Sequence, residues 1–223
     1  MTEFVPIPAE AEWSVNLDPP STNEIALELQ YLKRNKAAGP DGLSPAFFKE
    51  GGQALLHELT TLLQCIWETE KIPLDWCKSV VVPIFKKGDR NSCENHRGIS
   101  LVSVASKLLT GLLLRRLTGT REKQVRENQA GFRPGRGCID HIFTIRQLLE
   151  VRHTYRRSTI TVFLDLRAAF DSVDRDVLFH CLSLKGVPRK YILLLQSLYS
   201  NCTSQVRAYN ELSPEFSTIS GVH

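Results

Sequence analysis

The feature that most constrains the fold of this chain is a short run of apolar and β-branched residues, TITVFL at 159–164, which ends on Asp165. Valine, isoleucine and threonine favour strands, and a run without polar alternation is typical of a strand buried on both faces. We therefore predict a buried strand at 159–164 with a carboxylate at its C-terminal end. A carboxylate there is desolvated unless something cationic compensates it, and strand ends are where α/β architectures place reactive groups.

Other segments carry the apolar spacing of helices. A capping box, Ser21 with Glu24, predicts the start of one helix, and leucines at helical spacing predict another over 53–69. A helix near 139–155 is expected to turn four apolar residues inward: Ile142, Ile145, Leu148 and Leu149.

Caps and breakers predict three more helices. One is expected to run through Leu117, one from a cap at Ser172 to Gly186, and one to begin after Pro188.

Two further segments are expected to be extended. The run SVVVPIF at 79–85 predicts a strand, and Pro83 indicates that this strand is an edge strand or carries a bulge. Residues 204–220 alternate like a hairpin around Asn210-Glu211. Helices with a few strands, without the regular alternation of a doubly wound sheet, predict a helix-rich α+β fold.

Composition and charge narrow the class of protein. The chain has 223 residues, 42% of them apolar and 23% charged, which excludes a disordered, collagen-like or disulfide-packed chain. The net charge of +4 is unevenly distributed, because residues 78–157 hold 17 basic and 6 acidic side chains. Such asymmetry indicates a segment that faces a polyanion.

Cysteine usage and apolar runs bear on the compartment. The six cysteines lie far apart without a C-x-x-C pair, which is typical of reduced thiols in an intracellular protein. The N-terminus does not have the pattern of a secretory signal, and no apolar run approaches the roughly 20 residues that span a bilayer. We therefore expect an intracellular protein without a membrane partner.

Two Cys-x-x-His pairs raise the alternative of a zinc site. Cys93 with His96, and Cys138 with His141, would give four soft ligands. The usual spacing instead couples two close cysteines to two close histidines, so the pattern disfavours zinc.

Three places could carry chemistry. Asp165 could be an oxygen ligand of Mg²⁺ in phosphoryl transfer, although an isolated aspartate after a strand is more often a helix cap or an ion-pair partner. Lys86 and Arg97 lie near the ends of a predicted two-stranded finger and could neutralise a triphosphate, or simply belong to a solvated hairpin tip. The loop GFRPGRG at 131–137 could bind phosphates through its two arginines, or be only a flexible basic loop.

Five motifs, taken in their order along the chain, indicate a protein family more specifically than any one of them does alone. The segments KAAGPDG at 36–42, VPIFKKGD at 82–89, NHRGISL at 95–101, QAGFRPGRGCID at 129–140 and FLDLRAAFDSV at 163–173 resemble the motifs of reverse transcriptases. The resemblance is to enzymes of non-LTR (LINE-type) retrotransposons. It implies a right-hand polymerase fold, with a fingers-like region at 21–157 and a partial palm at 158–223. Residues 1–20 are rich in proline and lack periodicity, so we expect them to form an extended lead-in.

The resemblance implies roles in the palm. Asp165 would be the first catalytic, metal-binding aspartate, with the carbonyl of Leu166 assisting at Mg²⁺. Phe170 would be the aromatic residue that excludes a ribose 2′-hydroxyl, and Ala169 would lie beside it at the nucleotide.

It also implies partners for the basic residues. Lys86 and Arg97 would hold the triphosphate of a deoxynucleotide, and Arg133 and Arg136 would lie near the RNA template and the DNA primer.

The end of the sequence gives a further expectation. The segment SGVH at 220–223 resembles the opening of the next family motif, and the motif after that, with two adjacent aspartates, does not occur in these residues. We therefore expect a domain truncated within the palm that does not polymerise by itself. The alternatives are a non-enzymatic nucleic-acid-binding remnant of a retroelement and, more remotely, a protein-interaction module that pairs through an open edge at 204–220.

Overall fold

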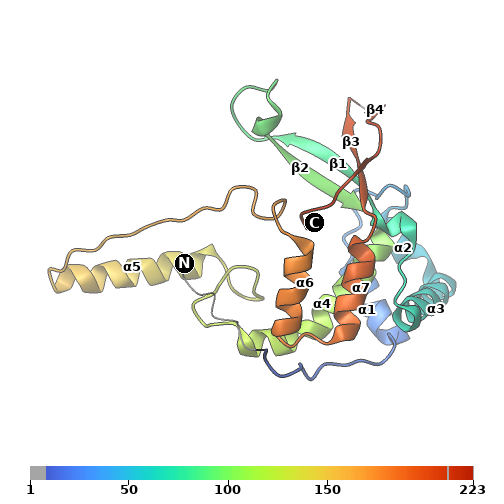
Figure 1. The fold of residues 1–223 in the computed structure, drawn as a ribbon, viewed down its shortest axis with the longest axis horizontal. Helices are drawn as coiled ribbons and strands as arrows, with labels where there is room; N and C mark the ends of the chain where they lie inside the picture. Colours follow the sequence, from blue (N-terminus) through green and yellow to red (C-terminus); the bar gives the residue numbers. More distant parts are fainter. Residues whose placement is uncertain (1–8, 210, 223) are drawn as a thin grey trace. The chain divides into compact units, whose positions relative to one another are not determined.

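The computed structural model describes residues 9–209 and 211–222, which belong to two compact units (Figure 1). One unit combines the described residues up to Arg116 with those from Phe170 onward, and the other spans Leu117–Ala169. The mixture of helices with a small sheet confirms the helix-rich α+β class. The boundaries expected at residues 20 and 157 stay predictions. Within the described part of the chain, no helix is both long and apolar enough to cross a membrane.

Most helices of the structure lie where the sequence predicts them. The capping box at Ser21 forms as expected, with the Ser21 hydroxyl accepting from the Glu24 N–H. The helices are α1 Thr22–Tyr31, α2 Pro45–Glu50, α3 Gly52–Thr69, α4 Val104–Gln124, α5 Cys138–Thr154, α6 Arg175–Leu184 and α7 Arg189–Tyr199. Short 3₁₀ turns precede β1 and β2, at Leu74–Cys77 and Cys93–Asn95.

One mixed sheet organises the larger unit. β1 (Lys78–Phe85) pairs antiparallel with β2 (His96–Val102) and parallel with β3 (Thr203–Ala208). Two short strands, β4 (Glu211–Leu212) and β5 (Phe216–Ser217), pair with β3. The pairing of β3 with β4 confirms a hairpin in this region, although residue 210 of its expected turn lies outside the described residues.

The two halves of β1 have different neighbours. Along β1, only Lys78–Val81 pair with β3, whereas the pairing of β1 with β2 extends as far as Phe85. Pro83 therefore falls where β1 is an edge strand, as its missing N–H requires. In the doubly paired half, the hydroxyls of Ser79 and Ser204 lie 2.7 Å apart and are buried between β1 and β3.

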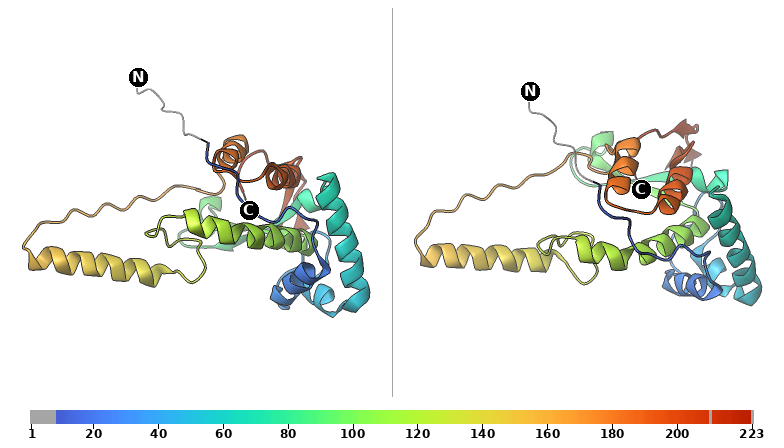
Figure 2. Two further views of the ribbon diagram at one scale, coloured as in Figure 1. Left: turned by 90° about the horizontal axis from the view of Figure 1, so that it is seen from below. Right: turned by 60° about the horizontal axis from the view of Figure 1, so that its bottom comes forward.

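The core of the larger unit is formed by helices packed together and against the sheet. The rings of Trp67 on α3 and Tyr191 on α7 meet edge to face, with their centroids 5.5 Å apart. Both views of Figure 2 show α6 and α7 side by side. The short connection between them contains Gly186, which has a φ of +80°. The fully buried aliphatic side chains of this unit include Ile25, Leu63, Leu108, Leu109, Leu112 and Leu194.

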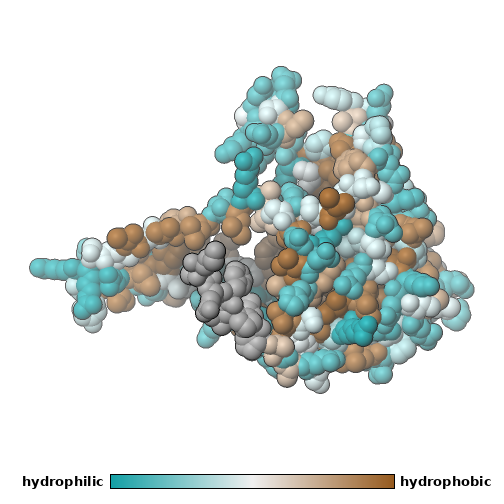
Figure 3. Space-filling model, in the orientation of Figure 1, coloured by the Kyte–Doolittle hydropathy of each residue, from teal (hydrophilic) through white to brown (hydrophobic). Residues whose placement is uncertain are grey.

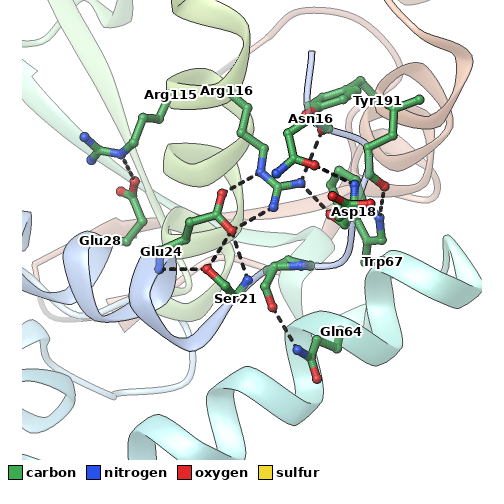
Figure 4. A network of polar contacts seen from close by, with 12 residues as sticks. Asn16, Asp18, Ser21, Glu24, Glu28, Gln64, Trp67, Arg115, Arg116 and Tyr191 are labelled. Atoms are coloured by element: carbon green, nitrogen blue, oxygen red, sulfur yellow. Dashed lines mark hydrogen bonds and ion pairs between the residues drawn. The ribbon is translucent and has the colours of Figure 1, made fainter.

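Residues 9–20 contain no helix or strand, yet their backbone is held by side chains of distant helices. The hydroxyl of Tyr191 donates to the carbonyl of Asn16 at 2.6 Å, and the indole of Trp67 donates to that of Leu17 at 3.0 Å. Gln64 of α3 donates to the carbonyl of Pro20 (Figure 4). These contacts attach the lead-in to helices that lie far away in the sequence.

Arg116 is the charged centre of this network (Figure 4). Its guanidinium makes two bonds to the carboxylate of Glu24, at 2.7 and 2.8 Å, and a third to the carbonyl of Asp18 at 2.7 Å. The bonds from Arg116, assisted by Ser21, lower the pKa of Glu24 to about 2. The pair is bidentate, and only 5% of the Arg116 side chain is exposed.

The prediction of a strand at 159–164 is wrong. These residues form no strand, and Ile160 and Leu164 are about nine-tenths exposed, at 92% and 90%. A strand buried on both faces needs neighbours that pair with its N–H and C=O groups and cover its side chains. The described residues offer it neither, because β1–β5 pair only among themselves.

Two finer predictions also need correction. The helix expected near 139–155 exists as α5, but Ile142 is 65% and Leu148 54% exposed instead of facing inward. Apolar residues are visible on the surface of α5 in Figure 3. The cap of α6 is Asp174 and not Ser172, since the Asp174 carboxylate accepts from the N–H groups of Asp176 and Val177.

Candidate nucleotide and nucleic-acid site

The antiparallel pairing of β1 with β2 brings Lys86 and Arg97 together. Ile84 is opposite Arg97, and the N–H of Lys86 donates to the carbonyl of Asn95 at 2.8 Å. Side chains alternate along a strand, so Ile84, Lys86 and Arg97 share one face, with the two cations as diagonal neighbours. Both cations are exposed, and neither forms an ion pair with a carboxylate of the described residues.

A structured turn connects the two strands of this hairpin. The carbonyl of Asp89 accepts from the Asn95 amide at 2.9 Å, and its carboxylate accepts from the N–H of Asn91. Gly88 has a φ of +90°, and a Cβ there would lie 2.7 Å from the Asn95 side chain. The turn therefore fixes where β1 ends and β2 begins, and with them the two cations.

Aromatic contacts support the other face of the hairpin. Phe85 meets the ring of His96 with centroids 5.6 Å apart, and the guanidinium of Arg90 lies 5.0 Å from the Phe85 centroid. The His96 ring also contacts the carbonyl of Ser92 at 3.1 Å. Because these groups occupy the opposite face, they leave the face of Lys86 and Arg97 open.

The glycine-punctuated basic loop lies in the smaller unit, and its two arginines differ. Arg133 donates to the carboxylate of Glu122 at 2.8 Å and to the carbonyls of Arg126 and Gln129. Arg121 and Arg133 together lower the pKa of Glu122. Arg136 is exposed, without an ion pair among the described residues. The guanidinium of Arg133 thus closes the loop, whereas that of Arg136 faces solvent.

Asp165, Leu166 and Ala169 also belong to the smaller unit, in the irregular segment after α5. Leu166 is 77% exposed and Asp165 is also exposed, in contrast to the expectation of a buried strand end. Ala168, between Leu166 and Ala169, has a φ of +49°, which is unusual for a residue with a Cβ. The turn at 167–172 therefore separates Asp165 from α6.

The donor atoms here suit a hard cation but do not complete a site. The Asp165 carboxylate and the Leu166 carbonyl are oxygen ligands of the type that Mg²⁺ takes. No group of three or more aspartate, glutamate, histidine or cysteine side chains gathers anywhere in the described residues. These residues by themselves thus offer two oxygen donors rather than a metal cage.

Phe170 belongs to the larger unit, where its backbone pairs with the 218–222 segment. The N–H of Val222 donates to the carbonyl of Phe170 at 3.0 Å, and that of Gly221 donates to the carbonyl of Val173 at 2.8 Å. Gly221 has a φ of +81°, and a Cβ there would lie 3.0 Å from Asp171 backbone atoms. The backbone of residues 170–173, which we call the 170–173 turn, is therefore held by bonds from Gly221 and Val222.

The sequence alone does not identify one residue that holds this region together, Arg175. Arg175 lies between Asp174 and Asp176 at the start of a helix, a pattern typical of a solvated helix end, yet it is only 9% exposed. Its guanidinium donates to backbone carbonyls of the 218–222 segment. No local sequence signal indicates this contact, because its partners lie more than 40 residues further along the chain.

Comparison with known proteins gives one family. The family described as "Reverse transcriptase (RNA-dependent DNA polymerase)" matches residues 84–220, which include the end of β1, all of β2, the basic loop and the 165–175 region.

Individual relatives agree with this match. The chain is 27% identical over 189 residues to "Transposon TX1 uncharacterized 149 kDa protein" of Xenopus laevis, covering 85% of this chain and 14% of the relative. It is 26% identical over 205 residues to "Probable RNA-directed DNA polymerase from transposon BS" of Drosophila melanogaster, covering 91% and 22%. It is 26% identical over 201 residues to the Pol polyprotein of the type-2 retrotransposable element R2DM of the same fly, covering 89% and 18%. The chain thus spans less than a quarter of each relative's length.

Proposed function

The chain belongs to the reverse transcriptase (RNA-dependent DNA polymerase) family, and we propose that it forms the fingers and part of the palm of a right-hand polymerase. In the proposed activity, the 3′-hydroxyl of a DNA primer on an RNA template attacks the α-phosphate of a deoxynucleoside triphosphate, so that one nucleotide is added and pyrophosphate leaves. The names of the transposon relatives support an element of the non-LTR type as its source.

The observation that carries this proposal is the shared face of Lys86 and Arg97. A triphosphate carries several negative charges, and two fixed cations on one face can contact neighbouring phosphate groups, with arginine giving bidentate bonds. Since neither cation is paired with a carboxylate of the described residues, neither has to break an ion pair to bind phosphate.

We assign Asp165 and Leu166 a role in binding the metal ion, and Ala169 and Phe170 a role in binding the nucleotide. A bound Mg²⁺ would supply charge stabilisation to phosphate oxygens in transfer. The Asp165 carboxylate and the Leu166 carbonyl would each offer it an oxygen. The ring of Phe170, about half exposed at 52%, would exclude a 2′-hydroxyl by its bulk, next to the small side chain of Ala169.

The basic loop is proposed to lie along the nucleic acid. The exposed guanidinium of Arg136 is available for a phosphate of the template or primer. Arg133 would contribute to nucleic-acid binding chiefly by maintaining the conformation of the loop, through its bonds to Glu122 and to two loop carbonyls.

A binding experiment tests the two hairpin cations. Fluorescent dTTP is titrated, with Mg²⁺, into the chain bound to an oligo(dT) primer on poly(rA). Lys86→Ala and Arg97→Ala should each weaken nucleotide binding about tenfold, the effect of losing one bond to a charged group. Lys87→Ala is the matched control, because it removes the same charge one residue further along, in the turn, and should change the affinity little.

Other results of this experiment would contradict the proposal. Equal losses in all three variants would indicate a general charge effect and not a triphosphate site. RNA binding without any nucleotide binding would favour the non-enzymatic remnant. The expectation that the chain alone adds no nucleotide stays a prediction, and primer extension by the same preparation would contradict it.

We also propose an intracellular location. The described cysteines are all free thiols, including the neighbouring pair Cys77 and Cys202, which supports a reducing compartment. Fractionation of cells that express the tagged chain would test this, and recovery from the secreted fraction would contradict it.

A further inference from the structure

Arg175 is a buried cation in an unfavourable position. It is the first residue of α6, where the helix dipole is positive, and only 9% of the residue is exposed. A guanidinium stays charged at any physiological pH, so its burial needs compensation from nearby groups. An arginine placed against local preference in this way points to a role that the local sequence does not explain.

The compensation comes from backbone carbonyls. Arg175 donates to the carbonyls of Gly221 at 2.9 Å, Thr218 at 2.8 Å, Ser220 at 3.2 Å and Tyr199 at 3.1 Å. Its guanidinium also lies 4.9 Å from the centroid of the Tyr199 ring. No carboxylate of the described residues forms an ion pair with it, so the orientation of these carbonyls determines whether the cation can stay buried.

The held carbonyls connect directly to the turn of Phe170. Ser220 and Gly221 accept from Arg175, while the N–H groups of Gly221 and Val222 donate to the carbonyls of Val173 and Phe170. The Ser220 hydroxyl reaches the carbonyl of Asp171 at 3.5 Å. Arg175 therefore fixes one strip of backbone, and that strip fixes the backbone from which the Phe170 ring projects.

We propose that Arg175 is a positioning residue for sugar discrimination: its bonds to the 218–222 segment hold the 170–173 turn, and so set how closely the Phe170 ring approaches the 2′ position of a nucleotide. The inference rests on the proposed function, since it assigns a support to the residue proposed to exclude ribose. Arg175 itself contacts no substrate in this account.

The proposal separates two ways in which loss of Arg175 could act. If Arg175 only stabilised the fold, its variants would weaken deoxy- and ribonucleotide binding in parallel with stability. If it positions Phe170, the turn relaxes, the ring withdraws, and binding of the ribonucleotide improves relative to the deoxynucleotide. The ratio of the two affinities is therefore the diagnostic quantity.

The test compares dUTP with UTP, which share a base and differ at the 2′ position. Both are titrated with Mg²⁺ into the full 223-residue chain bound to primer and template. Arg175→Gln should lower the preference for dUTP by about tenfold, corresponding to about 1.4 kcal/mol. Arg175→Lys, which keeps the charge but not the planar fork, should lower it less.

Arg189→Gln is the matched control, because Arg189 is also the first residue of a helix but is exposed. It should keep the preference of the unchanged chain. Gly221→Ala is a second, independent variant: it leaves Arg175 intact but places a Cβ 3.0 Å from Asp171, and it too should lower the preference. Thermal unfolding of each variant identifies any that do not fold.

The outcomes distinguish failure of the Arg175 proposal from failure of the proposed function. A preference for dUTP that survives in folded Arg175→Gln and Gly221→Ala variants overturns the role of Arg175 while the proposed function stands. Failure of the unchanged chain to bind either nucleotide overturns the proposed function, and the inference with it. Lowered preference in folded variants, with the control unchanged, supports both.

Discussion

Arg116 and Arg175 are both largely buried guanidiniums, and they differ in what neutralises them. Arg116 is paired with the carboxylate of Glu24 through two hydrogen bonds, whereas Arg175 is surrounded by carbonyls. A carboxylate supplies its own charge wherever its backbone lies, but carbonyls must be held in place to do so. At the scale of single residues, Arg116 therefore serves stability, and Arg175 depends on the arrangement of a whole segment.

The Arg116–Glu24 pair predicts a pH dependence of stability. Because bonds from Arg116 lower the pKa of Glu24 from 4.5 to about 2 in the folded state, the contribution of the pair is fully present above pH 4.5. It is lost as the pH falls toward about 2, where the folded-state carboxylate is protonated. Glu24→Gln should lower the free energy of unfolding by about 2 kcal/mol at pH 7, measured by urea denaturation.

The difference between Glu24→Gln and the unchanged chain should shrink when the urea denaturation is repeated near pH 3. Glu50→Gln is the control, because Glu50 pairs with Arg34 on the surface, where both side chains are more than half exposed. That change should cost well under about 1 kcal/mol. Equal losses for the two variants at pH 7 would argue against a special role of the buried pair.

At the scale of elements, what the sequence predicts correctly is what local chemistry determines. The capping box at Ser21 and the leucine spacing over 53–69 involve residues within one helix, and both helices form as expected. The hairpin on which Lys86 and Arg97 lie was also predictable, since turn residues and β-branched runs indicate it. Burial is different, because it depends on what the rest of the chain places against an element.

The failures at 159–164 and α5 follow from this distinction. An apolar run indicates that a segment is suited to burial, but neither its covering layer nor its strand partner can be read from the run itself. The contacts of Arg175 were equally hidden, since its partners lie at 199 and 218–221. Long-range contacts thus account for the parts of the candidate site that the sequence left open.

Gly39, whose carbonyl accepts from the N–H of Gly42 in a turn, lies close to the backbone just before α4, and this predicts opposite effects of two glycine changes. A Cβ on Gly39 would lie 2.6 Å from the carbonyl oxygen of Val102 and 2.7 Å from the nitrogen of Ser103, both backbone atoms. Gly39→Ala should therefore lower the free energy of unfolding by about 1–3 kcal/mol, as overpacking does.

Gly119→Ala is the opposite case, because Gly119 lies within α4 and nothing is within 4 Å of its Cβ position. That change should stabilise the chain by about 0.5–1 kcal/mol, through the helix preference of alanine. Chemical denaturation of both variants measures these effects. A neutral Gly39→Ala would mean that the turn does not contact the start of α4 as described.

At the scale of the whole molecule, the two units differ in how their apolar residues are used. The larger unit has a core of buried large side chains, including Trp67 and Tyr191. In the Leu117–Ala169 unit, α5 has no buried residue, and the 160–166 segment is exposed throughout. Regions with few buried apolar contacts open at low free-energy cost, so the two units should differ in local stability.

Limited proteolysis can measure that difference. Trypsin should cut first after Arg156, Arg157 or Arg167, which are exposed and lie outside helices and strands. Arg116, within α4 and bonded to Glu24, should be cut much later and serves as the internal control. Mass spectrometry of the first products identifies the sites, and early cleavage after Lys107, Arg115 or Arg116 of α4 would contradict this difference in stability.

The buried hydroxyls of Ser79 and Ser204 help to specify the register in which β1 pairs with β3. β1 and β3 are parallel and 125 residues apart at this contact, so no turn between them specifies which residue faces which. A slip by one residue would put one serine opposite a different neighbour and leave a hydroxyl without its partner inside the sheet, at a cost of about 1–3 kcal/mol. Apolar residues at both positions would tolerate such a slip more readily. Two small polar atoms thus distinguish the native pairing from its nearest competitors, and they do so on β1, the strand that pairs with β2 in the hairpin.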